Sequence, residues 1–198
     1  MDILGWLSNL TNAGALLASF GPWVLVGMGV VVFIESGLLF PFLPGDSLLV
    51  TAAILRDSLN ISIWQILIVA IAAAIAGDQA GFWLGRRFGR GLFKPNARVL
   101  RTDRLEAAEA FFDRHGPLAL VLGRFVPIVR TFITVVAGVG KMNRRHFFTW
   151  SAVGAVAWAT GVTLLGYLLG GISFLQKNIE FMLVAIIVVS VLPMVWHW

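Results

Sequence analysis

The segment 61–85 is apolar over almost its whole length and contains a single charged residue, Asp78. A helix needs about 20 apolar residues to cross the hydrocarbon core of a bilayer, so this segment is long enough to do so. Two further segments, 146–170 and 179–198, have the same apolar character. The whole chain is 59% hydrophobic and 13% charged, with a mean hydropathy of +0.88, whereas a soluble domain is about 45–50% apolar. The sequence therefore predicts an all-α integral membrane protein.

The remaining composition argues against several classes of function. The chain has no cysteine, which excludes disulfides, thiolate metal sites and cysteine nucleophiles. The net charge of +5 does not indicate a nucleic-acid partner, because the basic residues cluster beside apolar runs. The motifs of serine hydrolases, zinc peptidases and phosphate-binding loops are absent, and the histidines are too scattered for a metal site. We therefore expect neither an enzyme nor a protein that needs a cofactor or a metal.

Two apolar segments contain helix-breaking residues where a spanning helix would be continuous. The sequence FPFLPGD, which contains Pro44 and Gly45, interrupts the segment 22–56, and Pro127 interrupts the segment 117–140. Proline removes a backbone donor and breaks a helix. Unpaired backbone groups at membrane depth must be covered by protein or line an aqueous cavity. We therefore interpret both segments as re-entrant hairpins, which enter and leave the membrane on the same side.

The two halves of the chain align with each other. Pro44 aligns with Pro127 and Phe42 with Phe125, at an offset of about 83 positions, and internal repeats of this kind are typical of transporters. Each half then consists of a surface helix, a hairpin and one spanning helix, so the two repeats are inverted in the membrane. We expect a single membrane domain over 1–198, with repeat one over about 1–86, a cytoplasmic linker and surface helix over 87–116, repeat two over about 102–170 and a last transmembrane helix over 179–198.

The polar segment between the repeats contains a predicted helix over 102–115, capped by Thr102 and ended by Gly116 and Pro117. It is either a solvated connector or an amphipathic helix on the membrane surface. We favour the surface helix because apolar segments flank it on both sides.

Basic residues give the orientation. Arginines and lysines are frequent over 86–114, which places this segment in the cytoplasm. Lys141, Arg144 and Arg145 lie on the same side only if 117–140 is re-entrant. The charge distribution therefore supports the hairpin interpretation independently of the prolines.

Four charged residues lie inside the apolar hairpins: Glu35 and Asp46 in the first, and Arg124 and Arg130 in the second. A charged residue at the centre of a membrane helix costs about 2.5–3.5 kcal/mol on insertion scales. If the hairpins meet, the acids face the arginines. One interpretation is a set of buried ion pairs that only ties the hairpins together. The other is a cavity in which the arginines bind an anion such as a phosphate and the carboxylates exchange protons.

A stripe of small residues surrounds the remaining buried acid. Gly77, Gly81, Gly85 and Gly89 recur every four residues, which lets two membrane helices approach closely, so we interpret the stripe as a packing surface. For Asp78 two roles stay open, namely pairing with a base and binding ions.

Three sequence blocks are similar to the DedA family of bacterial membrane proteins, which carries the SNARE-associated or VTT domain. They are Glu35 followed by FLPGDSLL, then GDQAGFWLGRRFG, and then FFDRHGPLALVLGRFVPIVRTFITVVAGVGKM. The similarity covers roughly residues 20–170. This resemblance implies paired re-entrant hairpins, an inverted repeat and work on membrane lipids, since some members return undecaprenyl phosphate across the cytoplasmic membrane and eukaryotic relatives scramble phospholipids. The essential acids and arginines of the family correspond here to Glu35, Asp46, Arg124 and Arg130.

We therefore expect a multi-pass transporter of the bacterial cytoplasmic membrane that translocates undecaprenyl phosphate or a related lipid phosphate, coupled to protons, cations or the membrane potential. Arg124 and Arg130 would bind the substrate and Glu35 and Asp46 would couple it to ions. We expect supporting roles for Pro44, Gly45, Asp78, Pro127 and Thr131. The alternatives are an energy-independent phospholipid scramblase and a structural or assembly factor of the membrane. We expect no nucleic-acid partner, and association of identical chains stays open.

Overall fold

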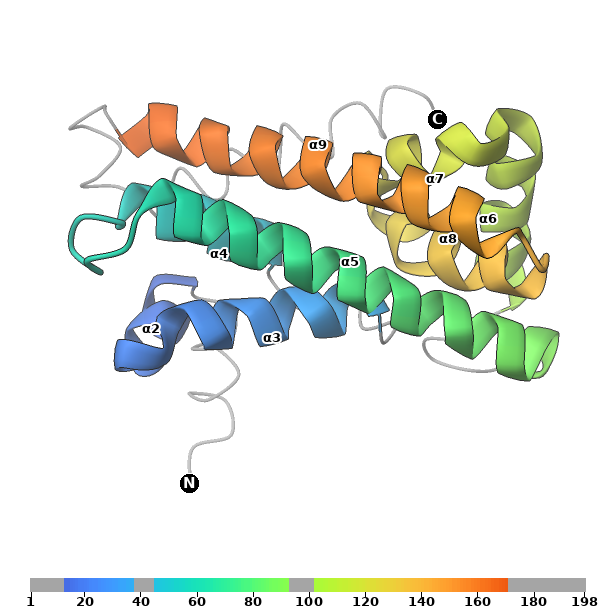
Figure 1. The fold of residues 1–198 in the computed structure, drawn as a ribbon, viewed down its shortest axis with the longest axis horizontal. Helices are drawn as coiled ribbons and strands as arrows, with labels where there is room; N and C mark the ends of the chain where they lie inside the picture. Colours follow the sequence, from blue (N-terminus) through green and yellow to red (C-terminus); the bar gives the residue numbers. More distant parts are fainter. Residues whose placement is uncertain (1–12, 38–44, 93–101, 171–198) are drawn as a thin grey trace.

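The computed structural model describes residues 13–37, 45–92 and 102–170, and within these ranges every regular element is a helix (Figure 1). The α-helices are α2 (Ala13–Ser19), α3 (Val24–Gly37), α4 (Gly45–Ile54), α5 (Ile63–Phe88), α6 (Thr102–His115), α7 (Ala119–Leu122), α8 (Pro127–Val139) and α9 (Arg144–Gly170). Short 3-10 helices are η1 (Gly21–Trp23), η2 (Gly89–Leu92), η3 (Gly116–Leu118) and η4 (Gly123–Phe125). The expected last helix over 179–198 and Pro44 lie outside the described residues.

Two of these helices, α5 and α9, are long and apolar enough to cross a membrane. They pack against each other in opposite directions. Arg144 at the start of α9 lies near Trp83 of α5, and Tyr167 near the end of α9 lies near Gln65. In Figure 1 they are the long green and orange ribbons. The predicted helical class and two helices of spanning length are thus confirmed.

Two exposed tryptophans near the ends of α5 are separated by about the thickness of a hydrocarbon core. A capping box begins the helix, in which the backbone N–H of Gln65 donates to Ser62 Oγ at 3.2 Å and the N–H of Ser62 donates to Gln65 Oε1 at 2.8 Å. Trp64 is 70% exposed and Trp83 is 52% exposed. These two residues are nineteen positions apart (83 − 64), about 28 Å along a helix, and a hydrocarbon core is about 30 Å thick. Exposed tryptophans at this spacing are typical of the two membrane interfaces.

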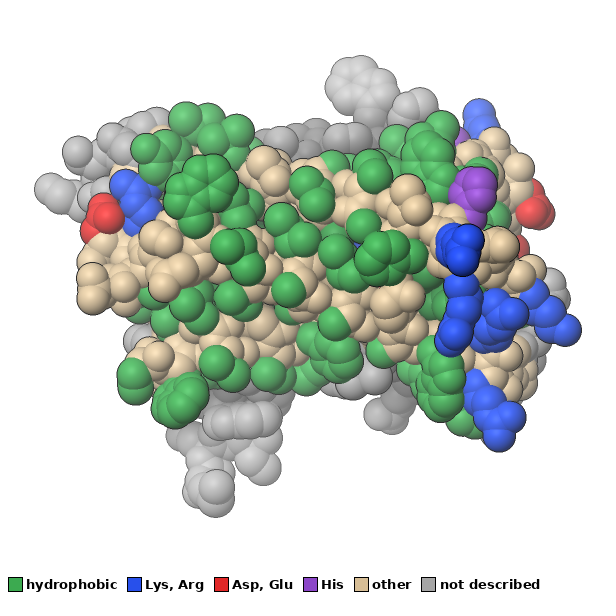
Figure 2. Space-filling view, in the orientation of Figure 1, with side chains coloured by type: hydrophobic (Ala, Val, Ile, Leu, Met, Phe, Trp, Pro, Cys, Tyr) green, Lys and Arg blue, Asp and Glu red, His purple; other side chains and the backbone are tan. Residues whose placement is uncertain are grey.

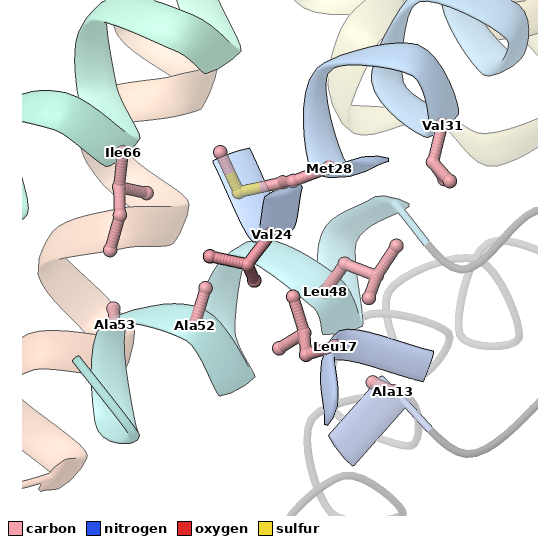
Figure 3. Close-up of a cluster of buried hydrophobic side chains, with 9 residues drawn as sticks. All are labelled: Ala13, Leu17, Val24, Met28, Val31, Leu48, Ala52, Ala53 and Ile66. Atoms are coloured by element: carbon pink, nitrogen blue, oxygen red, sulfur yellow. The ribbon is translucent and has the colours of Figure 1, made fainter. Parts of the chain in front are cut away.

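The first hairpin is formed by α3 and α4, which fold back on each other beside α5. Val24 and Met28 of α3 pack in one cluster with Ala52 of α4 and Ile66 of α5 (Figure 3). At the other end of α3, Gly37 lies against Gly77 of α5. Both outer ends of the hairpin therefore lie at the amino-terminal end of α5.

The second hairpin, formed by α7, η4 and α8, approaches from the opposite end of α5. Ala119 of α7 and Ala137 of α8 belong to one cluster with Phe147 at the start of α9 and Phe82 near the end of α5. Beyond α8, the backbone oxygen of Met142 accepts a hydrogen bond from Arg86 Nη1 at 3.4 Å. Both outer ends of this hairpin therefore lie at the carboxyl-terminal end of α5.

The glycine stripe of α5 is a packing surface, as predicted, along three of its four members. A Cβ atom on Gly77 would lie 2.7 Å from the backbone oxygen of Phe33, and one on Gly81 would lie 2.6 Å from Thr134 Oγ1. A Cβ atom on Gly85 would overlap the backbone oxygen of Val135 in α8. The fourth, Gly89, has no such neighbour and instead ends α5 with a φ of +59°, where a side chain would be strained.

The helix predicted over 102–115 is present as α6. Its residue Ala108 is buried in a cluster with Phe132, Val135 and Val136 of α8, while Glu106 and Asp113 on other faces are exposed. The apolar face of α6 therefore packs against α8 of the second hairpin.

Charged groups gather at one end of the molecule. Figure 2 shows an apolar middle with most of the basic side chains at the end where α5 finishes and α9 begins. The exposed basic residues there include Arg86, Arg87, Lys141, Arg144 and Arg145. At the other end Arg56 pairs with Asp57 at 3.2 Å. The basic residues from which the sequence predicts a cytoplasmic side therefore lie together at one end of the described structure.

The glycine packing gives a prediction about stability. Gly85→Ala should lower the free energy of unfolding by about 1–3 kcal/mol, because the new methyl group has to push α5 and α8 apart. Gly161→Ala is the matched control in α9, since no atom lies within 4 Å of its would-be Cβ atom, and it should be neutral or stabilise the helix by up to about 1 kcal/mol. Thermal unfolding in detergent measures both. Equal midpoints for the two variants would contradict the close contact of α5 with α8.

Candidate functional site

The tip of the second hairpin separates the two arginines. Pro127 is the first residue of α8, and Val126 before it has an extended backbone with φ −111° and ψ 107°, as residues before proline prefer. Arg124 lies before this break in η4, and Arg130 lies after it near the start of α8. The chain reverses here, because Gly123 before the break lies beside Val129 after it.

Arg130 binds both acids of the first hairpin. Its Nη1 donates to the two carboxylate oxygens of Asp46 at 2.8 and 2.7 Å, and its Nη2 donates to Glu35 Oε1 at 2.5 Å. The side chains of Arg130 and Glu35 are each 10% exposed, whereas that of Asp46 is 52% exposed. One guanidinium thus joins the two hairpins at a site that is buried on one side and reaches the surface at Asp46.

The start of α4 shapes this site. Asp46 lies in the first turn of the helix, where the helix dipole favours a carboxylate. Gly45 next to it is buried, and a Cβ atom there would overlap Glu35 Oε2. Gly45 is therefore needed so that the Glu35 carboxylate can reach Arg130 between α3 and α4.

Trp158 of α9 completes the Arg130 site. Its indole Nε1 donates to Asp46 Oδ1 at 2.8 Å, and the Arg130 guanidinium carbon lies 5.0 Å from the centre of its ring. Such a cation–π contact stabilises an arginine that has left water. Trp158 was not among the residues that the sequence predicted for the site. Trp158 is only 2% exposed, unlike Trp64 and Trp83, but the sequence of an apolar helix does not show which of its tryptophans will be buried.

Arg124 forms a second buried site with Asp78. Its Nη2 donates to Asp78 Oδ2, and Ser151 Oγ of α9 donates to the same oxygen. Asp78 is 2% exposed and Arg124 is 7% exposed. Two roles were open for Asp78, pairing with a base and binding ions, and in the structure it pairs with Arg124. Gly154 makes room for the pair, since a Cβ atom there would lie 3.1 Å from Arg124 Nε.

A small cavity separates the two arginines. It is lined by Arg124, Arg130, Asp78 and Ser151, together with Thr134 of α8. Its volume of about 10 Å³ gives room for roughly one water molecule. Thr134 Oγ1 is buried there and has no hydrogen-bond partner within the described ranges. Both arginines therefore border one polar cavity, although they bind different acids.

The two sites lie at different depths. Ser151 and Trp158 are seven residues apart on the same side of α9, which corresponds to about 10 Å along the helix axis. The acids Glu35, Asp46 and Asp78 outnumber the arginines of the two sites. With all groups ionised, the combined charge is therefore one negative unit.

The structure assembles most of the residues predicted for the site. Glu35, Asp46 and Arg130 meet in one cluster, and Arg124 lies in the adjoining one with Asp78. Pro127 begins α8 and Thr131 follows in the same helix. Ser151 and Trp158 are additional polar partners, and neither residue stands out by type or spacing in the sequence. Within the part of the chain that the structure describes, no three His, Asp or Glu side chains gather in a way that could hold a metal ion.

Comparison with known proteins places the chain among membrane proteins. Residues 43–168 match the VTT domain. The chain is 41% identical over 202 residues to Protein DedA of Escherichia coli, and the match covers 98% of this chain and 92% of that protein. Uncharacterized membrane proteins of Mycobacterium tuberculosis and Mycobacterium leprae are 43% and 40% identical, over 88% and 85% of this chain and 78% of each relative. No solved structure matches the chain.

The Arg124 site yields a double-mutant prediction. Asp78→Asn should lower the free energy of unfolding by about 3–5 kcal/mol, because it leaves a buried guanidinium without its counter-charge. Replacing both partners, as in Asp78→Leu with Arg124→Met, should recover much of that loss. The control is Asp57→Asn in the exposed pair with Arg56, which should change little. Thermal unfolding in detergent measures all three proteins. A double variant that is no more stable than Asp78→Asn alone would contradict a direct pair.

Proposed function

The chain belongs to the DedA family, whose members carry the VTT domain, and from this premise we propose that it is a lipid transporter of the bacterial cytoplasmic membrane. Its proposed substrate is undecaprenyl phosphate or a related lipid phosphate. The observation that carries the proposal is Arg130, held by two carboxylates of the other hairpin in a protein with an apolar surface. A buried arginine with exchangeable acidic partners is suited to binding a phosphate.

The proposed transporter has two inverted repeats. The hairpin of α3 and α4 has its outer ends at one end of α5, and the hairpin of α7 and α8 has its outer ends at the other end. In a membrane, the two hairpins would enter from opposite sides and meet at Arg130. This arrangement supports the proposed repeats over about 1–86 and 102–170, as far as the described residues cover them. Transporters built from inverted repeats bind their substrates where the repeats meet.

The substrate phosphate would replace the carboxylates on Arg130. A guanidinium presents a planar pair of donors that fits two oxygens of a carboxylate or of a phosphate equally well. Asp46 occupies Arg130 Nη1 with both of its oxygens, and its side chain is half-exposed. A phosphate arriving from that side could therefore take the place of Asp46 while Glu35 keeps its contact with Nη2.

The charge balance supports coupling to protons. The two sites already carry one more carboxylate than guanidinium, and a phosphate adds further negative charge at low dielectric. Asp46, once displaced, would lie beside both the phosphate and Glu35, and like charges that share a site favour protonation of one of them. Binding of the lipid phosphate should therefore be accompanied by proton uptake at Glu35 or Asp46.

Two alternatives differ from this proposal in measurable ways. An energy-independent phospholipid scramblase would move lipids with little response to pH or membrane potential. A structural or assembly factor would need the ion pairs but no lipid at the arginines, so exchanging the charges of Glu35 and Arg130 would preserve its role. The half-exposed carboxylate of Asp46 supports transport, because it leaves a side from which a lipid phosphate can approach Arg130.

Replacing each arginine by lysine tests the substrate site. Arg124→Lys and Arg130→Lys should weaken binding of undecaprenyl phosphate ten-fold or more, because lysine lacks the planar fork and a lost charge-assisted bond costs about 1.5–3 kcal/mol. Binding is measured on purified protein in nanodiscs. The control is Arg56→Lys at the far end of the molecule, which should bind normally. Unchanged affinity in both variants would mean that the arginines are structural partners only.

The pH dependence of binding tests the coupling. If one proton is taken up with the lipid, affinity should rise as pH falls, by up to about ten-fold per pH unit. Glu35→Gln combined with Asp46→Asn should remove this dependence and abolish transport. Binding of the wild-type protein that is independent of pH, together with pH-independent transport, would reject coupling and leave the scramblase.

A further inference from the structure

A groove opens between α5 and α9 at the basic end of the molecule. It has a volume of about 780 Å³, within the range of small-molecule binding sites. It is lined on the α5 side by Gln79, Ala80 and Trp83, and on the α9 side by Arg144, Arg145 and Phe148. Figure 2 shows basic and apolar side chains next to each other over this end of the two helices. The groove is separate from the buried sites of Arg124 and Arg130.

The groove has a cationic end and an apolar wall. Arg144 and Arg145 are exposed and are the first two residues of α9, before its apolar part begins. Along the wall, Trp83 is 52% exposed and Phe148 is 51% exposed. Trp83 lies at the predicted membrane interface, so in a membrane the two guanidinium groups would lie at the depth of lipid headgroups and the wall would face acyl chains. Basic pockets between membrane helices on the cytoplasmic side are suited to acidic headgroups.

A buried donor in the groove has no partner. Gln79 Nε2 is inaccessible to solvent and makes no hydrogen bond within the ranges described. An unpaired amide donor costs about 1–3 kcal/mol when it is removed from water. Because water cannot reach this nitrogen, a ligand oxygen could bind it only after the Gln79 side chain turns into the groove. Gln79 therefore adds a polar side chain to the lining, and the inference rests on the arginines and the apolar wall.

We propose that this groove binds an anionic phospholipid of the leaflet at the basic end. The phosphate would lie between the guanidinium groups of Arg144 and Arg145, whose forks match phosphate oxygens. The glycerol ester region would lie over Gln79, and an acyl chain would lie along Ala80 and Phe148. The site goes beyond the proposed transport, because a lipid can bind here without being moved across the membrane.

The test is lipid binding to the purified full chain by native mass spectrometry, with phosphatidylglycerol compared with phosphatidylcholine. Arg144→Gln combined with Arg145→Gln should weaken phosphatidylglycerol binding by at least ten-fold. The matched control is Arg87→Gln combined with Lys141→Gln, which removes the same charge from the same end but outside the groove lining. This control should bind phosphatidylglycerol to within about two-fold of the wild-type protein.

A second variant, Ala80→Phe, fills the groove without changing any charge and should also reduce phosphatidylglycerol binding. Arg130→Lys should leave it unchanged, which separates this site from the proposed transport site. Equal losses in the two double variants would overturn the proposal in favour of general surface charge. It would also be overturned by equal binding of phosphatidylcholine, by competition from soluble glycerol phosphate at the same concentration, or by full binding in Ala80→Phe.

Discussion

The bond between Arg130 and the two acids Glu35 and Asp46 is the interaction on which the rest of the structure depends. It brings together two hairpins that enter the molecule from opposite ends, and neither hairpin could carry its charge into an apolar setting alone. Residues from other parts of the chain make this interaction possible. Gly45 makes room for the Glu35 carboxylate, and Trp158 covers the guanidinium and binds Asp46. The position of each hairpin in the fold is therefore tied to this cluster.

Close helix packing is the second requirement. The hairpins reach the cluster only because α5 offers a surface without side chains, with Gly77 against α3 and Gly85 against α8. Such packing supplies the contacts that hydrophobic burial cannot supply between helices in lipid. The same helix has exposed tryptophans, Trp64 and Trp83, at a spacing close to the thickness of a hydrocarbon core.

Much of this arrangement could be predicted from the sequence, because charge inside an apolar run and proline inside a helix are both costly and must have a reason. Those two costs located Glu35, Asp46, Arg124 and Arg130 and indicated the chain reversal at Pro127. The partners in α9 could not be predicted. Ser151 and Trp158 are ordinary residues in a long apolar helix, and only the rotation of α9 against α5 turns them toward the charges. The pairing of the charges could not be predicted either. The sequence does not show that Arg124 pairs with Asp78 while Arg130 pairs with both Glu35 and Asp46.

The seven-residue spacing along α9 has a consequence for how the two ion-pair sites are linked. Ser151 and Trp158 lie on one side of the helix about 10 Å apart; Ser151 binds the Asp78 carboxylate that pairs with Arg124, and the ring of Trp158 lies beside Arg130. Rotation of α9 about its own axis would therefore act on both ion-pair sites at once, because one helix face supplies a polar partner to each of them.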